Sequence, residues 1–278
     1  MILLKGKKIA DKILDNLKKE INQKRLKLKL AVVLIEEDEI SKIFLRQKEI
    51  VCEKIGVDFE LFQFSEKTKF NELKKEIEKI SNNPSNSAVV IQLPLPRALK
   101  GKTQEILNII PAEKDIDILS EYNLGRFYSG TLPVLPPVVG AISYLLKEYK
   151  IPIKGKNILL VGAGRLVGFP LTIWFLKEMA TVSVINEFTK NASFFTKKAD
   201  ILISGVGKPN LINSSMVKKG AVVIDAGTSY KNGELVGDVD FKNVSKKVSY
   251  ITPVPGGVGP LTIVYLLENL LKLANLHE

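Results

Sequence analysis

The chain is poor in histidine, cysteine and arginine: its 278 residues include one histidine, one cysteine and five arginines. The one histidine, His277, is the penultimate residue, so the sequence excludes Ser-His-Asp and Cys-His catalysis and a histidine-rich zinc site. Cys52 has no second cysteine for an intrachain disulfide, which is typical of proteins in a reducing compartment. Acid–base chemistry must therefore use Lys, Asp, Glu, Tyr or a bound cofactor.

Long apolar runs are also missing. No stretch of the sequence approaches the roughly 20 apolar residues that are needed to span a bilayer. The apolar start at residues 1–4 is too short for the hydrophobic part of a signal peptide. We therefore expect a cytoplasmic protein that has no membrane partner.

The net charge of +11 comes mostly from lysine. Surfaces that bind nucleic acids more often carry clustered arginines or aromatic platforms. Here lysines alternate with glutamates, as at residues 74–79, which is typical of a solvated helix face. We therefore expect no nucleic-acid partner, although the charge would attract an anionic substrate. A basic dinucleotide sensor or nucleic-acid-binding protein without turnover is the alternative that this charge favours.

The first half of the chain alternates between strand and helix patterns. Apolar runs predict strands at residues 30–35, 58–64 and 88–92, and helical periodicity predicts helices at residues 7–25, 41–55 and 70–80. This βαβαβ order predicts a parallel sheet with helical crossovers. Residues 111–137 show few periodic signals and contain three prolines after Pro111, so we interpret them as interdomain loops.

The same kind of pattern restarts in the second half, after a helix predicted at residues 138–149. Strands are predicted at residues 157–161, 181–185, 201–204 and 221–224, and the helices at 166–177 and 261–274. The sequence therefore predicts two α/β domains.

A glycine-rich turn follows the strand at residues 157–161. Gly162 permits the tight turn, Gly164 lets the backbone approach a pyrophosphate, and Gly168 allows close packing of helix and strand. The spacing of Gly162, Gly164 and Gly168 is one residue longer than the usual dinucleotide fingerprint. A tight turn without a ligand is the alternative. The strand–turn–helix context favours a dinucleotide, which would also contact Ala163 and Arg165.

Glu187 follows the next strand, near the distance expected for an acid that binds the adenosine ribose. In one interpretation it binds the ribose hydroxyls, which favours NAD because a carboxylate repels a 2′-phosphate. In the other it points to solvent, and Arg165, Lys190 or both receive a 2′-phosphate. The sequence leaves both interpretations open.

Lys48 is the candidate acid–base group. Phe44, Lys48 and Cys52 lie at i, i+4 and i+8, so they share one largely apolar helix face. Burial on such a face lowers the pKa of a lysine and makes it a usable acid or base. A surface lysine whose stem covers the apolar face is the alternative, and spacing alone favours it.

Two further polar residues are candidates for the same site. Gln92 ends a predicted strand, where open α/β sheets place their ligands, and its amide could orient Lys48 or a substrate. Asp117 is suited to gripping the adjacent N–H donors of a fused-ring heterocycle, and it shares one side with Asp115 if the segment is extended. A strand-end hydrogen bond for Gln92 and solvated carboxylates for the aspartates are the alternatives.

A loop at residues 252–262 is dense in proline and glycine. Such a loop folds sharply, and its backbone can approach a ligand closely. A plain surface loop does not need so many special backbone residues.

Together these motifs resemble the bifunctional methylenetetrahydrofolate dehydrogenase/methenyltetrahydrofolate cyclohydrolase family over nearly the whole chain. The strings that carry the resemblance are VIQLPLP at 90–96, KDID at 114–117, YNLGR at 122–126, VGKP at 206–209, VGDV at 236–239 and TPVPGGVGPLT at 252–262. The helix at 41–56, with its central Lys48 and Cys52, belongs to the same set.

The resemblance implies two α/β domains flanking a cleft, the second a Rossmann-like NAD(P)-binding domain, and a homodimer. It assigns residues 1–136 and 262–278 to a folate-binding catalytic domain and residues 137–261 to the cofactor domain. It implies oxidation of 5,10-methylenetetrahydrofolate with NADP, the family's usual cofactor, or with NAD, which Glu187 would allow. It also implies hydrolysis of the methenyl product to 10-formyltetrahydrofolate.

The resemblance implies roles for individual residues. Lys48 corresponds to the catalytic lysine, Gln92 to the glutamine that orients it, and Asp117 to the aspartate that anchors the pterin. The residues expected to bind substrate are Phe44, Leu93, Pro253, Pro255, Gly256 and Gly257. Those expected to bind the dinucleotide are Gly162, Ala163, Gly164, Arg165, Gly168, Glu187, Lys190, Gly207 and Thr228. No metal site is expected.

Four departures from the family pattern affect these expectations, one of them the segment PPVV at 136–139, which lacks the polar groups usual there. Phe44 replaces the usual tyrosine, so no hydroxyl can bond to Lys48 from that position. Ser120 lies where the family has a different continuation after Asp117, and Glu187 replaces a small or basic residue. The alternative that Phe44 and Ser120 favour is a monofunctional dehydrogenase with weak or no cyclohydrolase activity.

Overall fold

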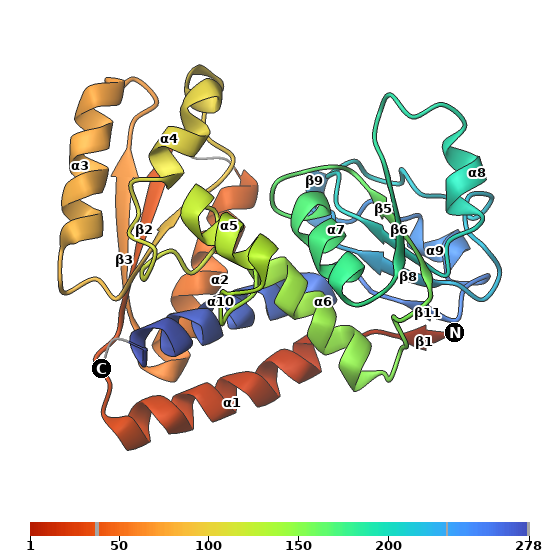
Figure 1. Ribbon diagram of the computed structural model, residues 1–278, viewed down its shortest axis with the longest axis horizontal. Coiled ribbons are helices and arrows are strands. Elements are labelled where there is room, and N and C mark those ends of the chain that lie inside the picture. Colours follow the sequence, from red (N-terminus) through yellow and green to blue (C-terminus); the bar gives the residue numbers. More distant parts are fainter. Residues whose placement is uncertain (37–38, 232, 277–278) are drawn as a thin grey trace. The chain divides into compact units, whose positions relative to one another are not determined.

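The computed structural model describes residues 1–36, 39–231 and 233–276, so His277 lies outside the described part. The chain forms two compact units (Figure 1). Unit 1 comprises Met1–Asp11 and Val138–Thr262, and unit 2 comprises Lys12–Pro137 and Ile263–Glu278. Among the helices of the described residues, none is long and apolar enough to cross a membrane.

Unit 2 is built around a three-stranded parallel sheet in the order β3-β2-β4. The central strand β2 (Lys29–Ile35) pairs with β3 (Asp58–Phe64) and β4 (Ala88–Ile91). Its buried alternate residues Ala31, Val33 and Ile35 pack in one core with apolar residues of α3 (Phe70–Asn82) and α4 (Thr103–Leu107). The crossover α2 (Glu39–Ile55) carries Lys48.

The remaining elements of unit 2 are the 3-10 helix η1 (Arg97–Lys102), α5 (Glu121–Ser129) and most of two long helices. These are α1 (Gly6–Lys24) and α10 (Val258–Ala274), and the boundary between the units falls inside each of them. The sequence does not predict α4 or α5, and it treats the region around α5 as interdomain loops. That interpretation is wrong, because α5 lies within unit 2 and buries Asn123 and Phe127.

The ends of α5 explain why a helix forms without a long apolar period. Ser120 caps its start by accepting a hydrogen bond from the Asn123 N–H, and Gly130 ends it in the left-handed conformation with φ of 81°. Both signals are present in the sequence, but the helix is only nine residues long. Caps therefore define this helix, whereas amphipathic spacing defines the longer ones.

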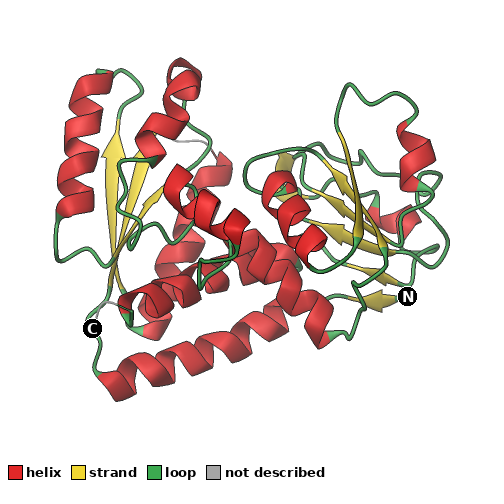
Figure 2. Ribbon diagram, in the orientation of Figure 1, coloured by secondary structure: helices red, strands yellow, loops and turns green. Residues whose placement is uncertain are grey.

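Unit 1 contains a six-stranded parallel sheet in the order β1-β11-β8-β7-β5-β6 (Figure 2). Its strands are β1 (Ile2–Leu3), β5 (Asn157–Val161), β6 (Thr181–Ile185), β7 (Ile201–Ser204), β8 (Val222–Asp225) and β11 (Tyr250–Ile251). The order reverses at β5, whose neighbours β6 and β7 follow it in sequence. Ligands of open α/β sheets bind at such a switch point, beside the carboxyl ends of the strands.

Besides the starts of α1 and α10, the described residues of unit 1 form four helices and an antiparallel hairpin. They are α6 (Pro137–Glu148), α7 (Gly168–Lys177), α8 (Ala192–Thr196), α9 (Phe241–Val244) and the hairpin of β9 (Ser229–Lys231) and β10 (Glu234–Val236). Helix α7 begins two residues later than its apolar period predicts, because residues 165–167 form a turn. Helix α10 begins three residues earlier than predicted and includes Pro260 in its first turn, where proline is tolerated.

The first eleven residues group with unit 1, whereas the sequence-based boundaries assign them to the folate-binding domain. The reason is strand pairing: Ile2 pairs with Tyr250 and Leu3 with Ile251, which places β1 at the edge of the large sheet. Tight packing continues at the start of α1. A Cβ on Gly6 would lie 1.9 Å from the Gly257 carbonyl oxygen.

This packing yields a prediction with a matched control. Gly6→Ala should lower the free energy of unfolding by about 1–3 kcal/mol, because the new methyl group meets backbone that cannot move easily. Gly125→Ala should instead raise it by about 0.5–1 kcal/mol, because Gly125 lies in α5 and a Cβ there would have nothing within 4 Å. Urea unfolding of both variants tests this, and equal stability of the two would contradict it.

Candidate functional site

Lys48 and Gln92 meet in unit 2, where they join α2 to the end of β4. The Lys48 Nζ donates a hydrogen bond of 2.8 Å to the Gln92 Oε1. The Gln92 backbone N–H donates to the Val33 carbonyl at 2.8 Å, and its Nε2 donates to the Leu93 carbonyl at 2.9 Å. These two bonds fix the amide so that its oxygen faces the lysine.

The surroundings of Lys48 change its acid–base behaviour. Lys48 is half-buried, and burial lowers the pKa of its ammonium group, while Asp117 and Cys52 oppose this with smaller raising effects. Burial also raises the pKa of the Cys52 thiol to about 12, so this thiol is neutral near pH 7. Of the two groups on this helix face, burial therefore favours loss of the proton from the amine and disfavours it from the thiol.

Asp117 lies within electrostatic reach of Lys48. Burial raises the pKa of its carboxyl to about 6, the Lys48 charge lowers it, and Asp115 raises it. The structure thus brings together the three residues nominated from the sequence: Lys48, Gln92 and Asp117. The alternative of a surface lysine whose stem covers the apolar face is wrong, because Lys48 is half-buried and its ammonium group donates a hydrogen bond to Gln92.

Asp115 has a different environment from Asp117, although both come from one short motif. The Asp115 carboxylate is 1% exposed and accepts hydrogen bonds from the Leu119 N–H, from the Ser120 N–H at 2.9 Å and from the Ser120 Oγ at 2.6 Å. The segment is a series of turns and not an extended strand, so the condition for the expected shared side of Asp115 and Asp117 is not met. Asp115 holds the loop that carries Asp117.

Two asparagines brace the same loop, and neither is a candidate from the sequence. The Asn123 Nδ2 donates to the Ala112 carbonyl at 2.8 Å and to the Asp115 carboxylate at 3.2 Å. The Asn269 Nδ2, on α10, donates to the Ile116 carbonyl at 2.9 Å and to the Leu135 carbonyl at 2.8 Å. Asn123 lies in a family motif that could have drawn attention to it, but nothing in the sequence around Asn269 signals this contact.

Phe44 lies four residues before Lys48, and Leu93 directly follows Gln92. Both side chains are half-buried. Phe44 lies one helical turn before Lys48, so its ring belongs to the same face of α2. The missing hydroxyl at position 44 does not leave Lys48 without a partner, because Gln92 supplies the hydrogen-bond acceptor.

The glycine turn of unit 1 has the geometry expected of a dinucleotide turn. Gly162 has φ of +99°, which disfavours any residue with a Cβ. A Cβ on Gly168 would lie 2.0 Å from the Gly162 carbonyl oxygen, so the helix can approach the strand only with glycine there. Nothing lies within 4 Å of a Cβ position on Gly164. This open space beside the backbone, next to Ala163 and the half-buried Arg165, is suited to a phosphate group.

A second tight turn follows β6, the neighbour of β5. The Asn186 Oδ1 accepts a hydrogen bond of 3.0 Å from the Phe188 N–H, and the Asn186 carbonyl accepts one of 3.0 Å from the Thr189 N–H. This turn exposes Glu187 and Lys190 to solvent. The side chain of Glu187 is therefore exposed enough either to bind a ribose or to point to solvent, so both interpretations stay open.

Gly207 and Thr228 lie beside each other after β7 and β8. A Cβ on Gly207, whose φ is +77°, would be 3.4 Å from the Thr228 carbonyl oxygen. The Gly207 carbonyl accepts a hydrogen bond of 2.7 Å from the Ser229 hydroxyl. Both residues follow the carboxyl ends of neighbouring strands, on the same edge of the sheet as the glycine turn.

The proline- and glycine-rich loop links β11 to α10 in unit 1. Pro253 is half-buried and Pro255 is exposed. Gly256 has φ of +103°, and its carbonyl accepts a hydrogen bond from the Lys7 N–H. Gly257 lies against the start of α1, so packing explains part of the need for glycine in this loop.

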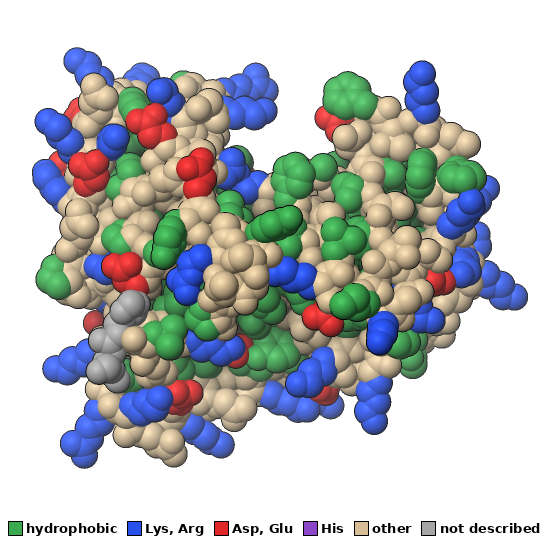
Figure 3. All heavy atoms as spheres, viewed as in Figure 1, with side chains coloured by type: hydrophobic (Ala, Val, Ile, Leu, Met, Phe, Trp, Pro, Cys, Tyr) green, Lys and Arg blue, Asp and Glu red, His purple; other side chains and the backbone are tan. Residues whose placement is uncertain are grey.

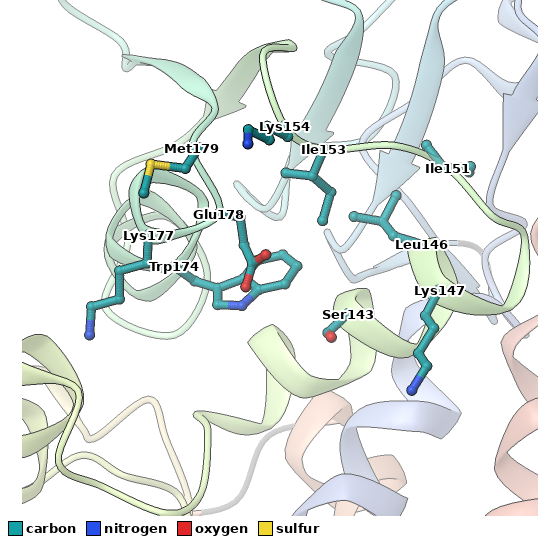
Figure 4. A pocket seen from close by; sticks show the side chains of 10 residues that line it. All are labelled: Ser143, Leu146, Lys147, Ile151, Ile153, Lys154, Trp174, Lys177, Glu178 and Met179. Atoms are coloured by element: carbon teal, nitrogen blue, oxygen red, sulfur yellow. The ribbon is translucent and has the colours of Figure 1, made fainter.

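A pocket of about 440 Å³ lies elsewhere in unit 1, between α6 and α7 (Figure 4). Trp174, Glu178 and Met179 line it with three lysines, and none of its lining residues was nominated from the sequence. In the close-up view the ammonium groups of Lys147 and Lys177 point away from the other lining side chains. On the molecular face shown in Figure 3, Lys and Arg side chains are likewise scattered and do not form one basic patch.

Comparison with known proteins identifies the family. Residues 4–117 match the tetrahydrofolate dehydrogenase/cyclohydrolase catalytic domain, and residues 136–278 match the NAD(P)-binding domain of the same family. The bifunctional protein FolD of Nautilia profundicola is 44% identical, over 99% of this chain and 97% of that protein.

Solved structures agree. The bifunctional FolD methylenetetrahydrofolate dehydrogenase/cyclohydrolase of Campylobacter jejuni is 38% identical and superposes with a TM-score of 0.93, covering 100% of both chains. The Trypanosoma brucei enzyme, solved with NADP cofactor and inhibitor, is 28% identical with a TM-score of 0.93, covering 100% of this chain and 98% of that one. The chain therefore belongs to the tetrahydrofolate dehydrogenase/cyclohydrolase family, and its second half is an NAD(P)-binding domain.

Proposed function

We propose that this chain oxidises 5,10-methylenetetrahydrofolate with a nicotinamide dinucleotide and hydrolyses the resulting methenyl cation to 10-formyltetrahydrofolate. The observation that carries the proposal is the hydrogen bond between Lys48 and Gln92, beside Asp117, in a chain of this family. The Nautilia and Campylobacter relatives are both named as bifunctional proteins. No finding favours the monofunctional alternative.

The hydrolytic step needs a group that moves protons. Water adds to the cationic carbon, and its oxygen loses both protons. N5 gains one proton as the bond between the carbon and N5 breaks. One proton is therefore released overall. Lys48 suits this exchange because its lowered pKa brings the neutral amine closer to pH 7. The Gln92 oxygen orients the amine, and the Asp117 carboxylate would accept hydrogen bonds from the pterin ring.

The oxidative step depends on positioning. A nicotinamide dinucleotide held at the glycine turn would supply the hydride acceptor, and the protein would supply binding and orientation. Gly164 leaves room for a pyrophosphate beside the start of α7, while Gly162 allows the tight turn and Gly168 the close approach of the helix. Phe44, Leu93, Pro253, Pro255, Gly256 and Gly257 are proposed as substrate contacts, and Arg165, Gly207 and Thr228 as dinucleotide contacts.

Removing the amine separates the two activities. Lys48→Met should lower the rate of methenyltetrahydrofolate hydrolysis by roughly 10²- to 10⁴-fold, because general acid–base catalysis contributes about that much. Oxidation of methylenetetrahydrofolate should fall much less. Lys42→Met is the matched control, since Lys42 lies on the same helix but is exposed and bonded to Glu39. Separate spectrophotometric assays measure the two steps. Unchanged hydrolysis in Lys48→Met would contradict the role of Lys48 as the proton-transfer group.

We infer that NAD binds more tightly than NADP. Glu187 lies exposed on the turn after β6, where the adenosine ribose of a dinucleotide is expected, and its charge repels a 2′-phosphate. Phe188, which is 83% exposed, follows it on the same turn. Lys190 and Arg165 are the nearby basic side chains that would oppose this preference.

Titration with NAD and with NADP tests the preference directly. NAD should have the lower Kd, and Glu187→Gln should reduce the difference by strengthening NADP binding, because the repulsion is removed. Glu234→Gln is the matched control for the change in net charge, since Glu234 is exposed on β10 in the same unit. Tighter binding of NADP by the unaltered chain would mean that Arg165 or Lys190 receives the 2′-phosphate.

We also propose a homodimer formed through unit 1. Strand β6 lies at the end of the sheet order, and edge strands that are left uncovered tend to pair with another chain. Val184 on this strand is 40% exposed, and the neighbouring helix α7 adds Leu176, which is 55% exposed. Met179, between the two elements, is 68% exposed. A second copy of the chain would cover this apolar surface.

Charge placed on this surface should break the dimer. A Leu176→Lys, Val184→Lys double variant should sediment as a monomer at concentrations where the unaltered chain is a dimer, because two lysines would be buried at the contact. Tyr230→Lys, which changes an exposed residue of the β9–β10 hairpin, should leave the dimer intact. A dimeric double variant, or a monomeric unaltered chain, would contradict the proposal.

A further inference from the structure

Two carboxylates of unit 1 are buried among its described residues and belong to neither of the proposed binding sites. Asp225, the last residue of β8, is 3% exposed, and Asp238, which follows β10, is 0% exposed. Their described hydrogen bonds come from backbone N–H groups and one hydroxyl. Burying a charged carboxylate is costly, so these bonds must offset a substantial desolvation penalty.

Asp225 fixes the position of Asp238. Its carboxylate accepts hydrogen bonds from the Asp238 N–H at 3.1 Å and from the Val239 N–H at 2.9 Å. A Cβ on Gly237 would lie 2.1 Å from the Asp225 Oδ2, so the segment can approach this carboxylate only with glycine there. The glycine of the VGDV motif is therefore explained by a carboxylate of the chain itself.

Asp238 in turn holds the loop that follows β7. Its Oδ2 accepts hydrogen bonds of 2.7 Å from the Ser204 hydroxyl and from the Val206 N–H. Its Oδ1 accepts one of 2.8 Å from the Lys208 N–H. One side chain thus fixes both ends of the loop at residues 204–208.

This loop packs directly against the glycine turn. A Cβ on Gly162 would lie 3.0 Å from the Val206 Cγ2 and 3.2 Å from the Gly205 carbonyl oxygen. A Cβ on Gly205 would lie 2.5 Å from the Val167 Cγ1. A displacement of the loop by even a few tenths of an ångström would therefore change the surface beside Gly162.

We propose that Asp238 is a positioning residue for the dinucleotide. Its carboxylate holds the Val206–Lys208 backbone so that the loop and the glycine turn form one preorganised surface at the carboxyl ends of β5 and β7. Asp238 acts through this loop and does not touch the ligand. The inference rests on the proposed dinucleotide site and adds the residue that fixes the conformation of its loop.

The chemistry of the site requires a carboxylate and not an amide. Three donors point at the two oxygens of Asp238, and both oxygens are used. An asparagine has the same size but replaces one oxygen, an acceptor, with an NH₂ group, which is a donor. This NH₂ group would face one of the donors that bind Asp238, and two donors cannot form a hydrogen bond with each other. At least one end of the loop would then lose its partner.

The test measures binding and turnover in the full-length chain. Asp238→Asn should raise the Kd for NAD, determined by calorimetry, by roughly 10- to 100-fold, because a hydrogen bond to a charged acceptor is replaced by an unpaired donor. The KM for NAD should rise with it, while the rate of methenyltetrahydrofolate hydrolysis, whose proposed proton-transfer group Lys48 lies in unit 2, stays unchanged. Ser204→Ala, which removes one donor and leaves two, should produce a smaller increase of the same kind.

Asp240→Asn is the matched control. Asp240 caps α9 two residues further along, and asparagine is an equally good cap, so NAD binding should not change. Unchanged binding in both Asp238→Asn and Ser204→Ala would overturn the inference, as would loss of hydrolysis and of thermal stability in parallel with binding. If the unaltered chain binds neither NAD nor NADP, the proposed function fails and this inference fails with it.

Discussion

The hydrogen bond between Lys48 and Gln92 is the interaction on which the chemistry proposed for unit 2 depends. An ammonium group withdrawn from water is stable only where an acceptor is held in place for it, and the backbone of β4 and β2 provides that hold through Gln92. The same withdrawal from water lowers the pKa of the amine. One local arrangement therefore both positions the lysine and adjusts its proton affinity.

The two units solve a common problem in the same way. Each must fix an irregular loop near the carboxyl ends of parallel strands, and each uses a fully buried aspartate that accepts hydrogen bonds from the loop backbone. Asp115 does this in unit 2 and Asp238 in unit 1. Because a movement of the loop would leave a buried carboxylate without its hydrogen-bond donors, the loop has one favoured conformation.

The sequence predicts the elements that have a clear apolar period, and it predicts the pairing of Lys48 with Gln92 through the family resemblance. It does not predict α4, α5 or the short strands, because caps and tertiary pairing define these elements. It also does not indicate the hydrogen bond of Asn269 to the Ile116 carbonyl or that of the Val206 N–H to Asp238, because each joins residues more than thirty positions apart. Local patterns contain no information on such partners, which only the folded chain brings together.

The pairing of β1 with β11 bears on how the chain is made. Residues 1–11 are synthesised before the rest of unit 1, and the neighbours of β1 in the sheet, Tyr250 and Ile251, are synthesised long after them. Unit 2 likewise lacks residues 263–278 until unit 1 has been translated. Each unit therefore contains a segment that is synthesised after most of the other unit, so neither can be completed before the bulk of the other has been translated.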